Sequence, residues 1–190
     1  NKAWDTQPVF SPDGKTLAYL AMKRPGFESD RYRIILKSWP DGKARSLTEK
    51  WDRSPSSIFW SGDGQKIYAT ADHLGQRSLF AVDVPTGDVR AVISEGFVRS
   101  PSVSGDRIIF GLGHLRSPVE LYSLSTDSGN IQKITGINDH KINAVKMGLP
   151  EQFHFKGWHD ETVYGYLRKT TNFTFVKKIP VSFLIHGGPQ

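Results

Sequence analysis

Hydrophobic and polar residues alternate along most of the chain in short runs, and turn-forming residues interrupt these runs at regular intervals. The clearest runs are residues 16–20, 66–70 and 107–110, and each follows a tight turn that contains Asp and Gly. Alternation with a period of two is the pattern of a β-strand that is buried on one face. The runs lack the 3.6-residue period of a helix. The pattern therefore predicts antiparallel strands joined by hairpins.

The alternating runs belong to a unit that occurs three times, with a spacing of about 46 residues. Each unit starts with an aromatic residue that lies four positions before a proline, at residues 4–8, 51–55 and 97–101. A tight turn, an alternating strand, a third strand, a second Gly-containing turn and a fourth strand follow in each unit. The third strands are expected at residues 33–39, 79–84 and 120–124, and the fourth strands end at residues 47–48, 92–93 and 134–135.

Four antiparallel strands per repeat, with two turns in step, are typical of β-propeller blades. An all-β sandwich is the alternative, but it does not account for two turns that recur in every unit. Three blades cannot close a ring, so their open edges require partners from the rest of the polypeptide. The sequence therefore predicts an all-β fold, a partial β-propeller of about three four-stranded blades over residues 1–147.

An apolar run at residues 180–185 leads into a His-Gly-Gly-Pro turn at residues 186–189. Consecutive glycines after a buried strand bring backbone N–H groups close to a reacting carbonyl, which is what an oxyanion hole requires. Such turns after an early strand are typical of α/β-hydrolases. Residues 148–190 are therefore expected to contain linker strands and the first strands of an α/β-hydrolase domain.

The sequence resembles the prolyl oligopeptidase family of serine peptidases over essentially its whole length. Residues 8–19 look like the blade motif of that family, and residues 150–157 followed by 180–190 resemble its passage from propeller to peptidase domain. Residues 24–31 and 183–190 look most like the branch that contains secreted fungal dipeptidyl-peptidases, beside the acylaminoacyl-peptidases. The resemblance implies a peptidase that releases dipeptides from the N-termini of peptides.

Members of this family use a Ser-Asp-His triad, with the serine in a Gly-x-Ser-x-Gly turn. The pattern does not occur in the 190 residues, so no triad residue is assigned and the isolated chain is expected to be inactive. The resemblance implies that the backbone N–H of Gly188, or else of Gly187, is one oxyanion donor. His186 is expected to order the turn by hydrogen bonding rather than to act as the catalytic base.

The longest loop after a second strand, residues 22–32, offers candidates for substrate binding. A dipeptidyl-peptidase has to recognise a free N-terminal ammonium, and a carboxylate from the propeller suits that purpose. Glu28 is the first candidate and Asp30 the second. The alternative is a solvated loop in which both acids pair with Arg24 or Arg31.

Composition excludes several other classes. The chain has no cysteine, which removes disulfides, thiolate metal sites and a Cys nucleophile. The net charge of +6 comes from scattered basic residues, so nucleic acid is not an expected partner. No run is long enough to span a membrane. His73 and His114 lie at equivalent places in two units, which favours a repeated structural role over a metal site, and no metal or cofactor is predicted.

Asn172 begins an Asn-Phe-Thr glycosylation sequon. Together with the lack of cysteine and the resemblance to secreted peptidases, it favours an extracellular protein. The expected partners are a peptide substrate and the rest of the same polypeptide, which would contain further blades and the catalytic domain. Two alternatives stay open: an acylaminoacyl-peptidase or esterase of the same fold, and a non-catalytic propeller that serves as a binding module.

Overall fold

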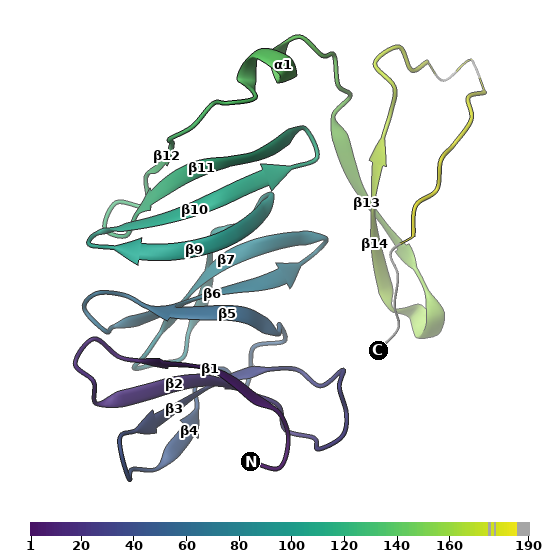
Figure 1. The fold of residues 1–190 in the computed structure, drawn as a ribbon. Helices are drawn as coiled ribbons and strands as arrows, with labels where there is room; N and C mark the ends of the chain where they lie inside the picture. Colours follow the sequence, from purple (N-terminus) through teal and green to yellow (C-terminus); the bar gives the residue numbers. More distant parts are fainter. Residues whose placement is uncertain (175, 177, 186–190) are drawn as a thin grey trace. The chain divides into compact units, whose positions relative to one another are not determined.

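A computed structural model describes residues 1–174, 176 and 178–185, and its contacts divide the chain into two units, residues 1–138 and 139–190. The first unit consists of three four-stranded antiparallel blades that follow one another along the sequence, and the second and third blades are joined into one eight-stranded sheet (Figure 1). The strands of the first blade are β1 (Asp5–Phe10), β2 (Thr16–Ala21), β3 (Arg33–Ser38) and β4 (Ala44–Ser46). Those of the second are β5 (Pro55–Trp60), β6 (Lys66–His73), β7 (Gln76–Asp83) and β8 (Val89–Ile93). Those of the third are β9 (Phe97–Ser104), β10 (Arg107–His114), β11 (Ser117–Ser125) and β12 (Ile131–Lys133).

Within each blade the strands pair in sequence order, so that the first strand lies at one edge of the sheet and the fourth at the other. The first strands of neighbouring blades contact each other, β1 with β5 and β5 with β9. One parallel bridge, between Arg77 and Phe97, also connects β7 to β9. The prediction of a partial propeller with three four-stranded blades is confirmed.

The turn between the first two strands of a blade is stabilised by its own side chains. Asp13 accepts a hydrogen bond from the Ser11 hydroxyl at 2.6 Å, and Gly14 follows with a φ of +70°, a value that favours glycine. Asp63 accepts the same bond from Ser61 at 2.6 Å in the second blade. These hydroxyl bonds are the main reason why the pKa values of Asp13 and Asp63 are lowered. The recurring Ser-x-Asp-Gly sequence therefore specifies a recurring turn.

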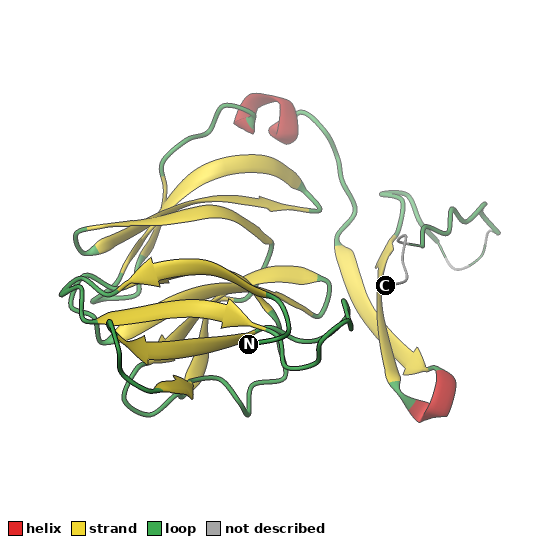
Figure 2. Cartoon of the chain, turned by 60° about the horizontal axis from the view of Figure 1, so that its bottom comes forward, coloured by secondary structure: helices red, strands yellow, loops and turns green. Residues whose placement is uncertain are grey.

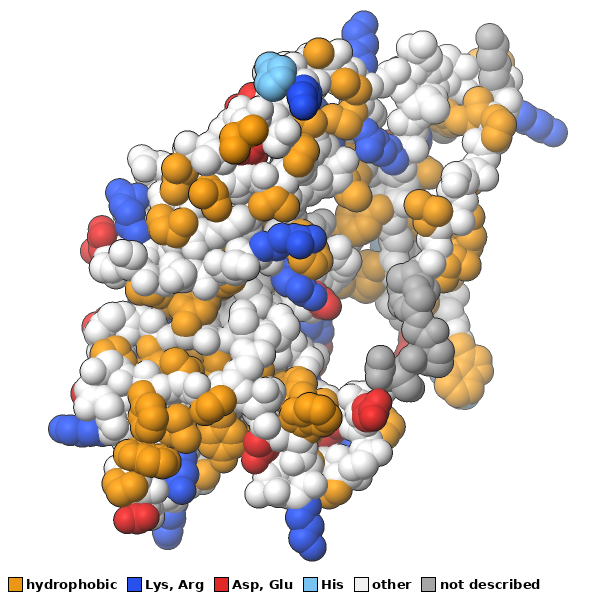
Figure 3. Space-filling model, viewed as in Figure 1, with side chains coloured by type: hydrophobic (Ala, Val, Ile, Leu, Met, Phe, Trp, Pro, Cys, Tyr) orange, Lys and Arg blue, Asp and Glu red, His pale blue; other side chains and the backbone are white. Residues whose placement is uncertain are grey.

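The hydrophobic core lies between the blades. One cluster joins the first blade to the second, with Leu20, Ile34 and Ile67 each 0% exposed. The other joins the second blade to the third and includes Leu79 and Ile108, also 0% exposed. The second blade is thus covered on both faces. On the first blade, Figure 3 shows hydrophobic side chains at the surface, in keeping with the exposure of Phe10 and Trp39.

The second unit contains little regular structure. The unit begins with a short helix, α1 (Asp139–Asn143), and β13 (Pro150–Lys156) pairs with β14 (Thr162–Arg168) around η1, a turn of 3₁₀-helix at Trp158–Asp160. Figure 2 shows these two short helices in red among strands and loops. No helix among the described residues is long and apolar enough to cross a membrane.

The apolar run at residues 180–185 was expected to be a strand, and the structure assigns none there. No strand among the described residues pairs with this segment, and side chains such as Phe183 and Leu184 are 78% and 88% exposed. A strand needs hydrogen-bonding partners on a sheet, which explains the difference. The boundary between the two compact units lies after Asn138. The predicted domain boundary between residues 147 and 148 stays a prediction.

Candidate functional site

The strongest catalytic candidates, Gly187 and Gly188, lie outside the described residues, as does His186. Their role at an oxyanion hole therefore stays a prediction. The candidate site that the structure does describe is the end of the blades where second strands lead into third strands and fourth strands lead into the next blade. The loop at residues 22–32 lies at this end.

Asp30 closes the loop upon itself. Its Oδ2 accepts the backbone N–H groups of Arg24 and Lys23, both at 2.7 Å, and its Oδ1 accepts the Arg24 Nε–H at 3.3 Å. Those two backbone hydrogen bonds, with Arg24 first, lower the pKa of Asp30 to about 2. Both carboxylate oxygens thus have partners within the loop. This is the structural pairing that the sequence left open as the alternative for Asp30.

Glu28 differs from Asp30 although it is only two residues away. Its side chain is exposed, and it forms no hydrogen bond or ion pair with any residue in the described part of the chain. Next to it, the Arg24 guanidinium forms a cation–π contact with the Phe27 ring, and its central carbon lies 3.8 Å from the ring centroid. Glu28 therefore stands free on a loop whose other charged side chains are engaged.

Arg31 fastens the base of the loop to the connection between the first and second blades. Its guanidinium donates hydrogen bonds to the carbonyl oxygens of Thr48 at 3.1 Å, of Glu49 at 3.0 Å and of Trp51. The sequence left Arg31 open, beside Arg24, as a partner for the acids of its own loop. It binds backbone carbonyls instead, because the five donors of a guanidinium can satisfy several carbonyls at once.

The two repeat-equivalent histidines have local partners. The Nδ1 of His73 accepts the Arg53 Nε–H at 3.0 Å, and that of His114 accepts the Arg116 backbone N–H at 3.3 Å. The His73 ring also contacts the edge or face of Phe80, with centroids 5.9 Å apart. Among the described residues, no three His, Cys, Asp or Glu side chains come together as a metal site.

Sequence reasoning missed Glu120, a buried carboxylate on β11. It is 2% exposed and accepts hydrogen bonds from the Thr135 hydroxyl, from the backbone N–H of Asn138 at 2.9 Å and from that of Ile137 at 3.2 Å. These bonds, the Thr135 hydroxyl first, lower the pKa of Glu120 to about 2. A charged residue within an alternating strand was the available signal, because such a residue is rarely buried without partners.

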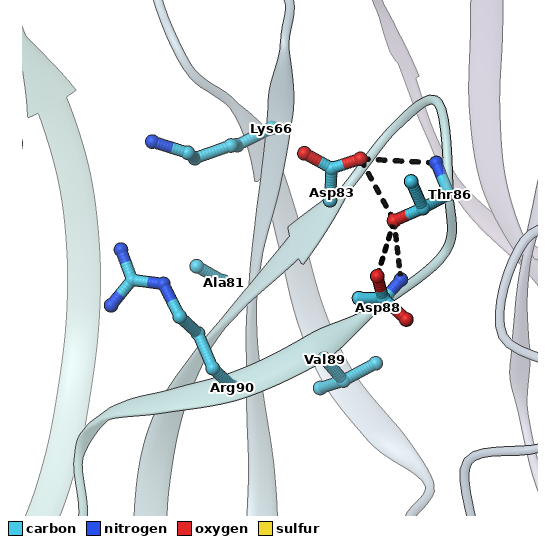
Figure 4. A pocket seen from close by; sticks show the side chains of 7 residues that line it. All are labelled: Lys66, Ala81, Asp83, Thr86, Asp88, Val89 and Arg90. Carbon is cyan, nitrogen blue, oxygen red and sulfur yellow. Dashed lines mark hydrogen bonds between the residues drawn. The ribbon is translucent and has the colours of Figure 1, made fainter.

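A hollow of about 270 Å³ lies at the opposite end of the second blade. Figure 4 shows Asp83 and Asp88 turned towards Thr86, whose hydroxyl donates to Asp83 at 2.9 Å or to Asp88 at 2.8 Å, while Lys66 and Arg90 extend away. The acids therefore serve the hairpin between β7 and β8. Because it lies at the other end of the strands from the loop at residues 22–32, this hollow is not part of the candidate site.

Comparison with known proteins places these observations in context. No protein-family model matches the chain. A probable dipeptidyl-peptidase 5 from Aspergillus niger is 33% identical over 190 residues, covering 96% of this chain and 26% of the relative. One from Emericella nidulans is 36% identical over 195 residues, again covering 96% and 26%. The chain is related to the prolyl oligopeptidase family. It spans about a quarter of the length of these relatives.

Solved structures support the fold. The acylaminoacyl peptidase of Pyrococcus horikoshii matches with a TM-score of 0.68 and 21% identity, over 86% of this chain and 25% of that one. TolB from Acinetobacter baumannii matches with a TM-score of 0.53 and 22% identity, over 71% of this chain and 33% of that one. Identities this low establish only the fold, which is that of propeller blades.

Proposed function

We propose that the chain is a section of a serine peptidase that releases dipeptides from the N-termini of peptides. The observation that carries the proposal is the extent of the match to fungal dipeptidyl-peptidases 5, which covers 96% of the chain and so includes residues beyond the blades. The match to TolB covers only 71%. A propeller that only binds partners has no need of the hairpin or of the apolar run that leads to the His-Gly-Gly-Pro turn.

In this proposal, a serine elsewhere in the polypeptide attacks the scissile carbonyl, and the Gly188 N–H, or that of Gly187, donates to the resulting oxyanion. The support is the sequence, a strand-forming run followed by two glycines. Losing one oxyanion donor typically lowers kcat by roughly 10²–10³-fold. We expect Gly188→Ala in the full-length enzyme to lower kcat by at least about tenfold, because the methyl group crowds the N–H. A folded variant with unchanged kcat would remove Gly188 from the site.

The propeller's part in substrate recognition falls to Glu28. Its carboxylate is exposed and has no partner in the described part of the chain, while the Asp30 and Arg31 contacts fix the loop on both sides of it. The anchored loop holds the backbone of Glu28 in place and leaves its carboxylate free to bind the N-terminal ammonium of a peptide.

The test compares two substrates of the full-length enzyme, a dipeptidyl chromogenic substrate with a free amine and its N-blocked counterpart. Glu28→Gln should lower kcat/KM for the free-amine substrate by at least about tenfold, since truncating a desolvated charge pair costs roughly 2–5 kcal/mol. The blocked substrate should be spared. Glu95→Gln, which removes another exposed acid at the same end of the blades, is the matched control. Equal losses for both substrates would assign Glu28 a structural role only.

The same proposal includes an extracellular location. Asn172 is exposed in a turn at the start of its sequon, as an N-glycosylated residue has to be. A mass decrease upon enzymatic deglycosylation of the protein secreted by its own host would support this part. Recovery of the protein only inside the cells would contradict it.

A further inference from the structure

Two arginines from neighbouring blades meet at one aromatic ring. The central guanidinium carbon of Arg77 lies 4.4 Å from the centroid of the Phe97 ring, and that of Arg99 lies 5.0 Å from it. Arg77 stands at the start of β7, whereas Phe97 and Arg99 stand at the start of β9, and the bridge between Arg77 and Phe97 holds the two strands together (Figure 1). Two like charges thus converge over one side chain.

The two charges are not compensated equally. Arg77 Nε donates to Asp72 Oδ1 at 3.0 Å. Arg99 is exposed and forms no hydrogen bond or ion pair with any residue in the described part of the chain. Its repeat equivalent in the second blade, Arg53, pairs with the Asp52 carboxylate at 2.7 Å. Of the two arginines at the Phe97 ring, Arg99 is therefore the one that lacks a carboxylate partner among the described residues.

Contact with the Phe97 ring prepares Arg99 to bind a carboxylate. A guanidinium that stacks on an aromatic face keeps its N–H edge free, and that edge matches the two oxygens of a carboxylate. Because the stack already limits the side chain's motion, less entropy is lost upon binding.

One exposed apolar side chain, Val119, lies close to the base of the Arg99 side chain. The residue opposite Arg99 on β10 is Gly111, and a Cβ there would lie 2.9 Å from a Val119 methyl carbon and 3.5 Å from the Arg99 Cβ. Glycine is thus required at this position so that Val119 can approach. Val119 itself is 44% exposed. The Arg99 guanidinium suits the carboxylate of a peptide's last residue, and the exposed Val119 suits the side chain of that residue.

We propose that Arg99, supported by Arg77 and Phe97, binds a carboxylate of the peptide substrate, the α-carboxylate at its C-terminus. This inference rests on the proposed peptidase function. The start of β9 lies at the same end of the blades as the loop that carries Glu28, since both belong to connections that leave second or fourth strands. One end of the propeller would then hold an acid for the peptide's amine and a base for its carboxylate, which would favour short peptides.

Binding, rather than turnover, tests the inference. The probes are peptides of four to eight residues with a reduced bond after the second residue, each prepared as the C-terminal acid, as the amide, and as the amide with a penultimate glutamate. Calorimetric titration of the full-length enzyme should show the acid binding about tenfold more tightly than the amide at one or more lengths, as expected for a charge-assisted hydrogen bond. Arg99→Gln should abolish that difference. Arg99→Lys, which keeps the charge without the planar edge, should retain part of it.

Arg90→Gln, an exposed arginine on the outermost strand of the second blade, is the matched control and should leave the difference intact. Equal affinities of wild-type enzyme for acid and amide, or equal losses for both in Arg99→Gln, would overturn the inference. If the amide with a penultimate glutamate binds more tightly than the C-terminal acid, the site recognises acidic side chains. That result would overturn the assignment to the C-terminus. An enzyme that distinguishes acid from amide but releases no dipeptide from cleavable peptides would keep this site and lose the proposed function.

Discussion

The second blade and the β13–β14 hairpin are built from the same kind of sequence, alternating strands joined by turns. Their side chains nevertheless differ in exposure, because those of the blade are buried and those of the hairpin are not. In the second blade, Ile67 is 0% and Tyr68 2% exposed, because neighbouring blades cover both faces of the sheet. None of residues 139–174, 176 and 178–185 is buried, and Phe153 and Phe155 remain 42% and 52% exposed. Alternation therefore specifies a strand, while stacking of sheets creates a core.

Local contacts in the hairpin are of the weak kind. The Phe153 and Phe155 rings stack with centroids 6.3 Å apart, and Lys169 Nζ lies 2.8 Å from the Glu151 carboxylate. An ion pair this exposed is typically worth about 0–1 kcal/mol, and a single hairpin is marginally stable in water. Packing in the blades therefore contributes more to the free energy of folding than the contacts of the hairpin do.

The largest expected effect is the loss of a buried side chain from the second blade. Ile67→Ala should lower the free energy of unfolding by about 2–5 kcal/mol, because it removes buried apolar contacts and leaves a cavity. Leu167→Ala, on the hairpin, removes a side chain that is 43% exposed and should cost less than about 1 kcal/mol. Denaturant unfolding of the full-length protein, followed by circular dichroism, compares the two. Equal costs would show that the hairpin has a core of its own.

A smaller effect is expected at Glu120, whose carboxylate accepts hydrogen bonds from the last residues of the first unit. Glu120→Gln replaces a carboxylate that accepts hydrogen bonds through both oxygens with an amide that cannot accept from Thr135, Ile137 and Asn138 together, so residues 134–138 should lose protection from hydrogen exchange. Melting temperatures at a series of pH values measure the accompanying loss of stability. Glu95→Gln is the control for loss of an exposed acid.

The sign of the pH dependence follows from the lowered pKa of Glu120. The folded-state value is about 2 against an ordinary 4.5, so the ionised carboxylate contributes stability above pH 4.5 that is lost as the pH falls towards 2. The difference in melting temperature between wild type and Glu120→Gln should therefore be constant near neutral pH and shrink between pH 4.5 and 2. A difference that does not change with pH would contradict the assignment.

The sequence predicts the blades well because their specification is local. A tight turn containing Ser, Asp and Gly and an alternating strand recur in each unit, and in the first two units the turn is stabilised by residues close in sequence, such as Ser11 and Asp13. The strand ends are less well predicted: β6 continues to His73, beyond the expected end at Thr70, because pairing with β7 extends it. The run at residues 180–185 carries the pattern of a strand but pairs with no strand in the part of the chain that the structure describes.

The candidate site was predictable only in part. The loop at residues 22–32 and its charged residues stand out in the sequence, but which acid is engaged and which is free depends on the fold of the loop around Asp30. Arg31 and Glu120 bind backbone groups that lie 17 or more residues away, at Thr48, Glu49 and Asn138 for example. Pairings of that kind leave no spacing in the sequence, so the structure is needed to find them.

The proposed activity is tested most directly by the products that the full-length protein releases from one peptide of about a dozen residues, supplied with a free N-terminus and as its N-acetylated copy. Mass spectrometry should detect successive dipeptides from the free peptide and release of the acetylated dipeptide from the blocked copy at least about tenfold more slowly, because the amine is the group that Glu28 is proposed to bind. Release of a single N-acetylated residue from the acetylated peptide, or no cleavage of either, would contradict the account.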